Sequence, residues 1–259
     1  MASLQTRFLT CAALMLSLAA CNPDDKNVQP IDVTVPTTIT PIQLPMIDGV
    51  YGAMYSVKVY HNIKGVGTRS EQASAVFYEE ASNTATATQM ANAGYVAVNQ
   101  FNLNQGVNNE YDRLAVEGQI FQDLNFDAGV RWYVQGDDGI PSVLYEWSPV
   151  FPEYSGDFPA TINRKDGLIL TFNESTLINA DSVFVAIAAG NKLIVKRYSA
   201  HAGVVSISRD ELAYIQACSL QNPGYLQISA SVINLFWISS GKAGVGVKQT
   251  TDIRTVVIK

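Results

Sequence analysis

Alternation of apolar and polar residues is the feature that most restricts what this chain can fold into. Val130, Trp132 and Val134 alternate with Arg131 and Tyr133. The same period of two recurs in two further sets of apolar residues: Tyr51, Ala53, Tyr55, Val57 and Val59, and then Leu226, Ile228, Ala230 and Val232. Because successive side chains of a β-strand point to opposite faces of a sheet, this period predicts strands and an all-β fold.

The composition indicates a chain that packs around a core. Hydrophobic residues make up 47% and charged residues 15%, well below the ~25% charge of an average soluble chain. This excludes a disordered chain and a coiled coil. With 17 Lys and Arg against 23 Asp and Glu the net charge is −6, and no basic cluster offers a surface for phosphates. Nucleic acid is therefore excluded as a partner.

Proline-rich segments suggest how the chain is divided. Residues 22–45 hold five of the ten prolines, which predicts an extended, polyproline-like tether. A second proline-rich stretch, from Pro141 to Pro159, places a domain junction near Gly156. We expect two immunoglobulin-like β-sandwich modules, residues 46–156 and 157–259, with a last strand at Ile253–Ile258 and a turn at Gly241–Gly244.

One short helix is expected in the second module. Ser208-Arg209-Asp210-Glu211 has the spacing of a capping box, in which the serine and the glutamate each accept a hydrogen bond from an unpaired backbone N–H. Leu212 and Ile215 follow at helical spacing. The pattern predicts that a helix begins after Ser208.

The N-terminus has the pattern of an export signal. Arg7 precedes the mostly apolar residues 8–20, and Asn22-Pro23 ends the run, so the run is shorter than the ~20 apolar residues that a spanning helix needs. Leu18-Ala19-Ala20-Cys21 then resembles the lipobox of bacterial lipoproteins. The resemblance implies cleavage after residue 20 and a lipid-anchored Cys21, with residues 21–45 as the tether. An ordinary signal peptide cut nearby is the alternative.

Two further resemblances concern Bacteroidota. Asp24-Asp25, close behind Cys21, resemble the surface-export signal of lipoproteins from that phylum. This implies an outer-membrane protein on the cell surface, with the periplasmic face as the alternative. Ala75-Val76-Phe77, the segment 94–99 and the segment 132–136 are similar to uncharacterised all-β Bacteroidota surface lipoproteins. That resemblance implies a fold and no reaction.

Residues that commonly carry catalysis are sparse. His61 and His201 are the two histidines, and no G-x-S-x-G or phosphate-loop motif occurs. We therefore predict no catalytic residue, cofactor or metal. A dispersed hydrolase site remains open, as does a loose calcium site, for which the oxygen donors would be Asp123, Asp127, Asp137 and Asp138.

Cysteine and serine each raise one further expectation. Cys11 would leave with the signal and Cys21 would carry lipid, so Cys218 would be the one free thiol and no intramolecular disulfide could form. Asp181-Ser182-Val183 fits the short pattern of Bacteroidota O-glycosylation. A position for Ser182 in a buried strand would exclude that modification.

Aromatic residues are dense between Trp132 and Phe158. Rings beside hydrogen-bonding carboxylates are a common way to hold sugars, and the candidate ligand-binding residues are Trp132, Tyr145, Trp147 and Tyr154. Since nothing in the periodicity forces the rings outward, packing in the core is the favoured interpretation.

The sequence as a whole favours a lipoprotein that binds without catalysing. Its expected partners are the bilayer, through acylated Cys21, and a glycan or an envelope protein. A structural or assembly lipoprotein is the alternative, and a hydrolase with a dispersed site is less favoured.

Overall fold

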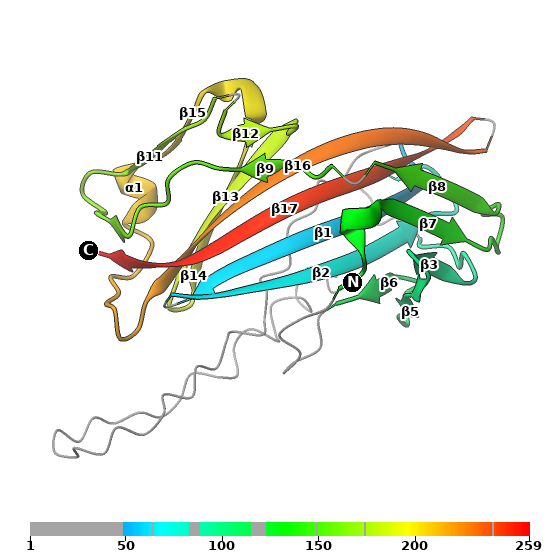
Figure 1. Cartoon of the computed structure of the whole chain (residues 1–259), viewed down its shortest axis with the longest axis horizontal. Helices are drawn as coiled ribbons and strands as arrows, with labels where there is room; N and C mark the ends of the chain where they lie inside the picture. Colours follow the sequence, from blue (N-terminus) through cyan, green and yellow to red (C-terminus); the bar gives the residue numbers. More distant parts are fainter. Residues whose placement is uncertain are drawn as a thin grey trace, which may run out of the picture. The chain divides into compact units, whose positions relative to one another are not determined.

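Four long strands form the centre of the structure. The computed structural model describes residues 49–63, 65–82, 89–114, 123–148, 150–173, 175–239 and 241–259. In it β1 (Gly52–Ile63), β2 (Val66–Phe77), β16 (Gly224–Ser239) and β17 (Lys242–Ile258) lie side by side (Figure 1). The predicted alternations fall in β1 and β16, so the expectation of strands there is confirmed.

These strands belong to a nine-stranded sheet, called here the long sheet. Its order is β14-β13-β16-β17-β1-β2-β6-β5, with β10 paired to β17 beside this path. The remaining strands are β13 (Ser182–Ala189), β14 (Lys192–Ser199), β6 (Tyr111–Arg113), β5 (Asn104–Gln105) and β10 (Thr161–Ile162). Strands from both sides of Gly156 thus pair in one sheet.

The pairing of β1 with β17 joins the two ends of the described chain. The strands are parallel and stay in register from Gly52 opposite Gly244 to Asn62 opposite Arg254. All described residues fall within one compact unit, Leu44–Lys259. The sheet therefore holds the earliest and the latest described strands together.

A smaller sheet covers one end of the long sheet. Its order is β4 (Phe101–Asn102), β3 (Val96–Val98), β7 (Val130–Val134) and β8 (Val143–Trp147). A first hydrophobic cluster combines side chains of the two sheets, including Met54, Phe77, Trp132, Val134, Phe236 and Ile238. Within it the Nε1 of Trp132 donates a hydrogen bond to the Oγ of Ser56 at 3.1 Å.

A second hydrophobic cluster lies on the same face toward the other end of the long sheet. It is covered by two strand pairs, β11 (Leu168–Thr171) with β15 (Val204–Ile207) and β9 (Glu153–Tyr154) with β12 (Leu177–Ile178). The cluster includes Leu170, Val185, Ile207, Leu212, Leu226 and Ile228. We call the face that carries both clusters the core face and the opposite one the back face.

Charged side chains fix a loop against the core face. Lys58 Nζ lies 2.6 Å from Asp127 Oδ1, and Arg69 Nη2 lies 2.8 Å from the other carboxylate oxygen. Buried Glu71 accepts hydrogen bonds from the backbone N–H groups of Leu124 and Phe126. These contacts hold residues 123–129, which include the 3₁₀ helix η2 (Phe126–Ala128), against β1 and β2.

The expected short helix is present as α1 (Arg209–Leu212). Ser208 and Glu211 make both hydrogen bonds of the capping box, which confirms that prediction. A 3₁₀ helix, η3 (Ala200–Ala202), lies before β15. The described structure is otherwise strands and connections, so the all-β class is also confirmed.

The last strand differs from the prediction. It begins at Lys242 rather than Ile253, and the expected turn at Gly241–Gly244 is confined to the residues before Lys242. Gly244 and Gly246 lie inside the strand, where aromatic rings occupy the space above them. A Cβ at Gly244 would lie 2.5 Å from Phe236 Cζ, and one at Gly246 would lie 2.8 Å from Tyr145 Cε1.

Candidate binding platform on the small sheet

The outward face of the small sheet carries a surface hollow of about 630 Å³. Alternation along β7 turns Val130, Trp132 and Val134 inward, while Arg131 and Tyr133 are exposed. Tyr133 lies between Ala97 of β3 and Leu144 of β8 in the pairing register, and Arg131 lies opposite Glu146. We call Tyr95, Arg131, Tyr133, Leu144 and Glu146 the tyrosine platform.

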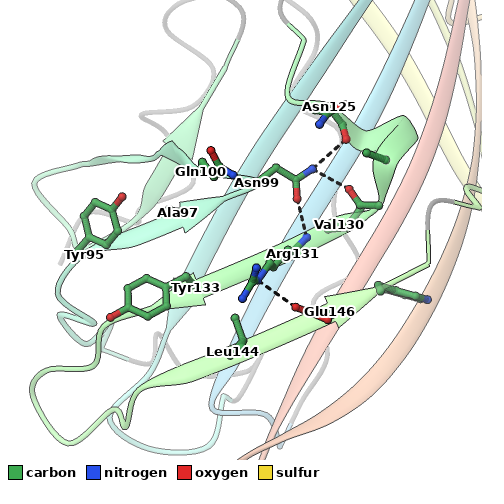
Figure 2. Close-up of a pocket in the computed structure, with 13 residues that line it drawn as sticks. Tyr95, Ala97, Asn99, Gln100, Asn125, Val130, Arg131, Tyr133, Leu144 and Glu146 are labelled. Atoms are coloured by element: carbon green, nitrogen blue, oxygen red, sulfur yellow. Dashed lines mark hydrogen bonds and ion pairs between the residues drawn. The ribbon is translucent and has the colours of Figure 1, made fainter.

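Two exposed rings form the apolar part of the tyrosine platform. Tyr95 and Tyr133 are each 43% exposed, and their ring centroids are 5.9 Å apart with an interplanar angle of 55°. Figure 2 shows the rings next to each other, with Leu144 on the neighbouring strand. The hydroxyl of Tyr95 donates a hydrogen bond to Asn102 Oδ1 at 2.5 Å. This bond fixes the orientation of one ring.

An ion pair forms the polar part. Arg131 Nε lies 3.0 Å from Glu146 Oε1, and both side chains are well exposed (Figure 2). At such exposure the pair adds little to stability. It presents guanidinium donors and carboxylate acceptors beside the rings, with no net charge.

The far wall of the hollow is held by Asn99. Its Nδ2 donates to the carbonyl oxygens of Leu124, Asn125 and Gly129 at 2.9, 3.1 and 2.7 Å, and its Oδ1 accepts from the backbone N–H of Arg131. The amide thereby ties the β3–β4 turn to the loop before β7 (Figure 2). The wall is consequently built from fixed backbone.

Three residues of this wall have a left-handed backbone. Asn99, Gln100 and Asn125 have φ values of 45°, 72° and 61°, a left-handed region that L-residues other than glycine seldom adopt. Asn99 and Gln100 are the two loop residues between the paired Val98 and Phe101, and positive φ at both positions is the ordinary geometry of a two-residue hairpin turn. The angles therefore define the shape of the wall.

Trp147 closes one edge of the hollow and connects it to the interior. Its ring is half-buried, and Lys248 Nζ lies 4.3 Å from the ring centroid. Lys248 is almost fully buried and donates to the carbonyl oxygens of Ser148 and Val150. Burial and, as the smaller cause, the nearby charge of Lys58 lower the pKa of Lys248 to about 8. The cation and the carbonyls together fix the chain that follows β8.

The four candidate residues from the sequence lie at different depths. Trp132 is 1% exposed in the first cluster, and Tyr154 is 9% exposed in the second cluster, beside a separate hollow of about 500 Å³. Tyr145 is half-buried, stacks on Phe236 at 4.6 Å and accepts a hydrogen bond from Asn234. Trp147 alone among the four lines the platform hollow. Their role in binding stays a prediction.

The sequence does not single out Tyr95 and Tyr133 as candidate residues. The signal for Tyr133 was available, since the alternation in Val130–Val134 already places it on the face opposite Trp132. Tyr95 precedes β3 and has no comparable signal.

The remaining chemical candidates lie apart from the platform. Buried His61 has no hydrogen-bond partner for Nδ1, and burial lowers its pKa, whereas His201 is exposed on η3. Within the described ranges neither imidazole bonds a serine or a carboxylate. In the same ranges no three His, Cys, Asp or Glu side chains are grouped as metal ligands.

Cys218 and Ser182 are both held in hydrogen bonds. The Sγ of Cys218 accepts from the backbone N–H groups of Gly224 at 2.9 Å and Ile258 at 3.2 Å. Ser182 is 3% exposed, and its Oγ lies 2.9 Å from the Oγ of Ser231. Ser182 therefore lies in a buried strand, the position that excludes O-glycosylation of the folded protein.

The predicted lipobox residues Leu18, Ala19, Ala20 and Cys21 lie outside the described residues, as does the predicted tether, residues 21–45. In the part of the chain that the structure describes, no helix has the length and apolar character to cross a membrane. The chain matches no known family model, no curated protein and no solved structure.

Proposed function

We propose that this protein is an outer-membrane lipoprotein that binds a glycan on the tyrosine platform and does not catalyse its conversion. The observation that carries the proposal is the platform itself, in which Tyr95 and Tyr133 lie beside the Arg131–Glu146 pair. Sugars present apolar C–H faces and hydroxyl rims. The rings suit the faces, and the charged pair suits the hydroxyls, because it offers both donors and acceptors.

The charge balance favours a neutral glycan. The platform contains one cation and one anion that already neutralise each other, and the whole chain carries a net charge of −6. A uronic-acid or sulfated chain would meet general repulsion and would have to separate Arg131 from Glu146. A neutral oligosaccharide can bond to both groups without breaking the pair.

The lining of the hollow supports binding rather than turnover. Glu146 is engaged by Arg131, and the other lining residues include no second carboxylate and no histidine. Glycoside hydrolysis commonly uses two carboxyl groups on opposite sides of the bond. The platform therefore suits a module that holds a sugar chain in place.

The location rests on the N-terminal sequence. Leu18-Ala19-Ala20-Cys21 supports a lipid anchor, and Asp24-Asp25 support surface display in a Bacteroidota-type envelope. The periplasmic face of the outer membrane is the alternative location. Two or more acyl chains on Cys21 would hold the protein stably without a spanning helix.

We also infer that residues 46–156 and 157–259 form two sandwich-like halves, as the sequence predicted. Two hydrophobic clusters support this division: the first comes mostly from residues before 156 and the second mostly from residues after it. Phe236 and Ile238 of the first cluster and Tyr154 of the second are the exceptions. The two halves share the long sheet, so each half consists of one covering layer over its own part of that sheet. Their immunoglobulin-like character stays a prediction.

A glycan array with a matched pair of variants tests the binding proposal. Purified protein is applied to neutral and acidic oligosaccharides, and Tyr133→Ala is compared with Tyr214→Ala, which removes a 74% exposed ring outside the platform hollow. Loss of a stacking ring at a binding site typically costs ~1–3 kcal/mol, or about 5- to 150-fold in affinity. We expect that loss for Tyr133→Ala and none for Tyr214→Ala, with similar melting temperatures for both.

Two results would contradict the proposal. Binding that is equally strong in Tyr133→Ala and the parent would move the site elsewhere. If the parent binds no glycan of either kind, the structural or assembly lipoprotein becomes the better interpretation.

A further inference from the structure

The hairpin that joins β16 to β17 has an unusual end. β1 begins opposite Gly244 of β17. The hairpin continues past the start of β1 with Trp237 and Ser239 of β16 and with Lys242 and Ala243 of β17. Figure 1 shows this end of the hairpin beyond the neighbouring strands.

Two large apolar side chains are exposed at this end. Leu235 is 67% exposed and Trp237 is 74% exposed. Both lie on the back face, because Phe236 and Ile238, which alternate with them, belong to the first cluster. Exposed apolar groups that lie close together on a soluble surface commonly mark a contact with a partner or a membrane.

The charge pattern around the hairpin is distinct from that of the chain. No Asp or Glu occurs from Leu212 through Thr251, although the chain holds 23 of them. Lys242 is the one charged residue at the hairpin end, and its Nζ lies 4.9 Å from the ring centroid of Tyr51. Tryptophan, leucine and lysine in a stretch of sequence without acidic residues are typical of segments that lie in the interfacial layer of a bilayer.

The described chain starts beside this hairpin. The backbone N–H of Tyr51 donates to the carbonyl oxygen of Ala243 at 2.8 Å, and Gly49 is the first described residue. The 48 residues outside the structure at this terminus include Cys21, so the segment that carries the expected anchor joins the fold at the hairpin end. The position of the hairpin end therefore favours a lipid surface as the partner that covers Leu235 and Trp237.

We propose that Leu235 and Trp237 insert into the interfacial layer of the membrane that holds the anchor. This inference rests on the lipid anchor of the proposed function. Exposed Glu79 and Glu80 follow β2 at the same end of the sheet, where only β1 separates β2 from β17, so the contact depends on apolar insertion rather than on attraction to anionic lipids. Zwitterionic phosphatidylcholine should suffice.

Tryptophan quenching by brominated lipid tests the inference on the full lipoprotein. The purified protein is reconstituted into phosphatidylcholine vesicles with ordinary or brominated acyl chains, and flotation and tryptophan emission are measured. We expect brominated lipid to reduce the emission of the parent and of Trp147→Phe. We expect no reduction for Trp237→Phe, which lacks the inserted indole while the anchor remains.

The outcomes separate the hairpin from the anchor. Protein that floats with the vesicles but has the same emission in both lipids overturns the insertion and leaves the anchor intact. Protein that does not float overturns both. A change in oligomeric state for Trp237→Ala in detergent would show that a second copy covers this end, which also overturns the membrane contact.

Discussion

Asp252 is a half-buried carboxyl group whose pKa depends on the fold around it. It lies on the core face of β17 opposite Tyr60 of β1, with Arg254 and Glu153 nearby. Burial raises its pKa to about 6, and the raising effect of Glu153 is opposed by Arg254. Because the folded pKa lies above the unfolded value of ~3.9, the folded state binds the proton more tightly. The stabilising contribution of this group is complete below the unfolded pKa and is lost as the pH rises through about 6.

Asp252→Asn should therefore raise the free energy of unfolding at pH 7 and leave it nearly unchanged at pH 4. The full shift corresponds to ~3 kcal/mol, which we reduce to about 1 kcal/mol because Asp252 is partly exposed. Urea unfolding at the two pH values measures the difference. Asp138→Asn, at an exposed turn, is the matched control and should follow the parent at both values. An equal gain at pH 4 would mean that the titration of Asp252 is not the cause.

At the scale of the elements, β7 and β17 show which strands the sequence can predict. β7 has a cluster on one side and solvent on the other, so its alternation is visible in the sequence and places Tyr133 outward. In β17 most side chains from Gly244 to Thr251 are buried on both faces, among them Lys248, Gln249 and Thr251. No alternation survives in such a segment. Its two glycines resemble turn residues, although they make room for the rings of Phe236 and Tyr145.

Alanine substitution of the two tryptophans in the small sheet is expected to give different results. Trp132 of β7 fills the first cluster, so Trp132→Ala should cost ~3–5 kcal/mol of stability. Trp147 of β8 is half-buried at the edge of the hollow, so Trp147→Ala should cost less stability and should weaken glycan binding by ~1–3 kcal/mol. Thermal melts read beside the glycan array separate the two. In the opposite outcome, Trp147→Ala binds glycan as the parent does and melts at a temperature as low as that of Trp132→Ala. That result would assign both rings to the core.

For the whole molecule, local patterns predict strands but not how distant strands pair. The all-β class and the strands β1, β7 and β16 could be predicted from alternation, whereas the parallel pairing of β1 with β17 leaves no mark in either segment. The tyrosine platform could not be predicted from local patterns for the same reason. Its rings come from β7 and from the segment before β3, and these meet only because Ala97 pairs with Tyr133. Spacing along the chain does not reveal such a contact.

The shared long sheet predicts that the two clusters unfold together. β16 contributes Leu226 and Ile228 to the second cluster and Phe236 and Ile238 to the first, so loss of either cluster frees the same strand. Leu226→Ala should cost ~2–5 kcal/mol. It should lower the urea midpoint seen by tryptophan emission as much as the midpoint seen by far-UV circular dichroism.

The tryptophans make this test selective. Trp132 and Trp147 belong to the first cluster or pack against it, and Trp237 lies at the same end of β16, so their emission reports on the end of the sheet away from Leu226. Leu193→Ala, at a 47% exposed position of the edge strand β14, is the control and should move neither midpoint appreciably. If Leu226→Ala shifts the circular dichroism and leaves the tryptophan transition in place, the halves are independent domains divided near Gly156. A common shift of both midpoints means that the long sheet makes them one cooperative unit.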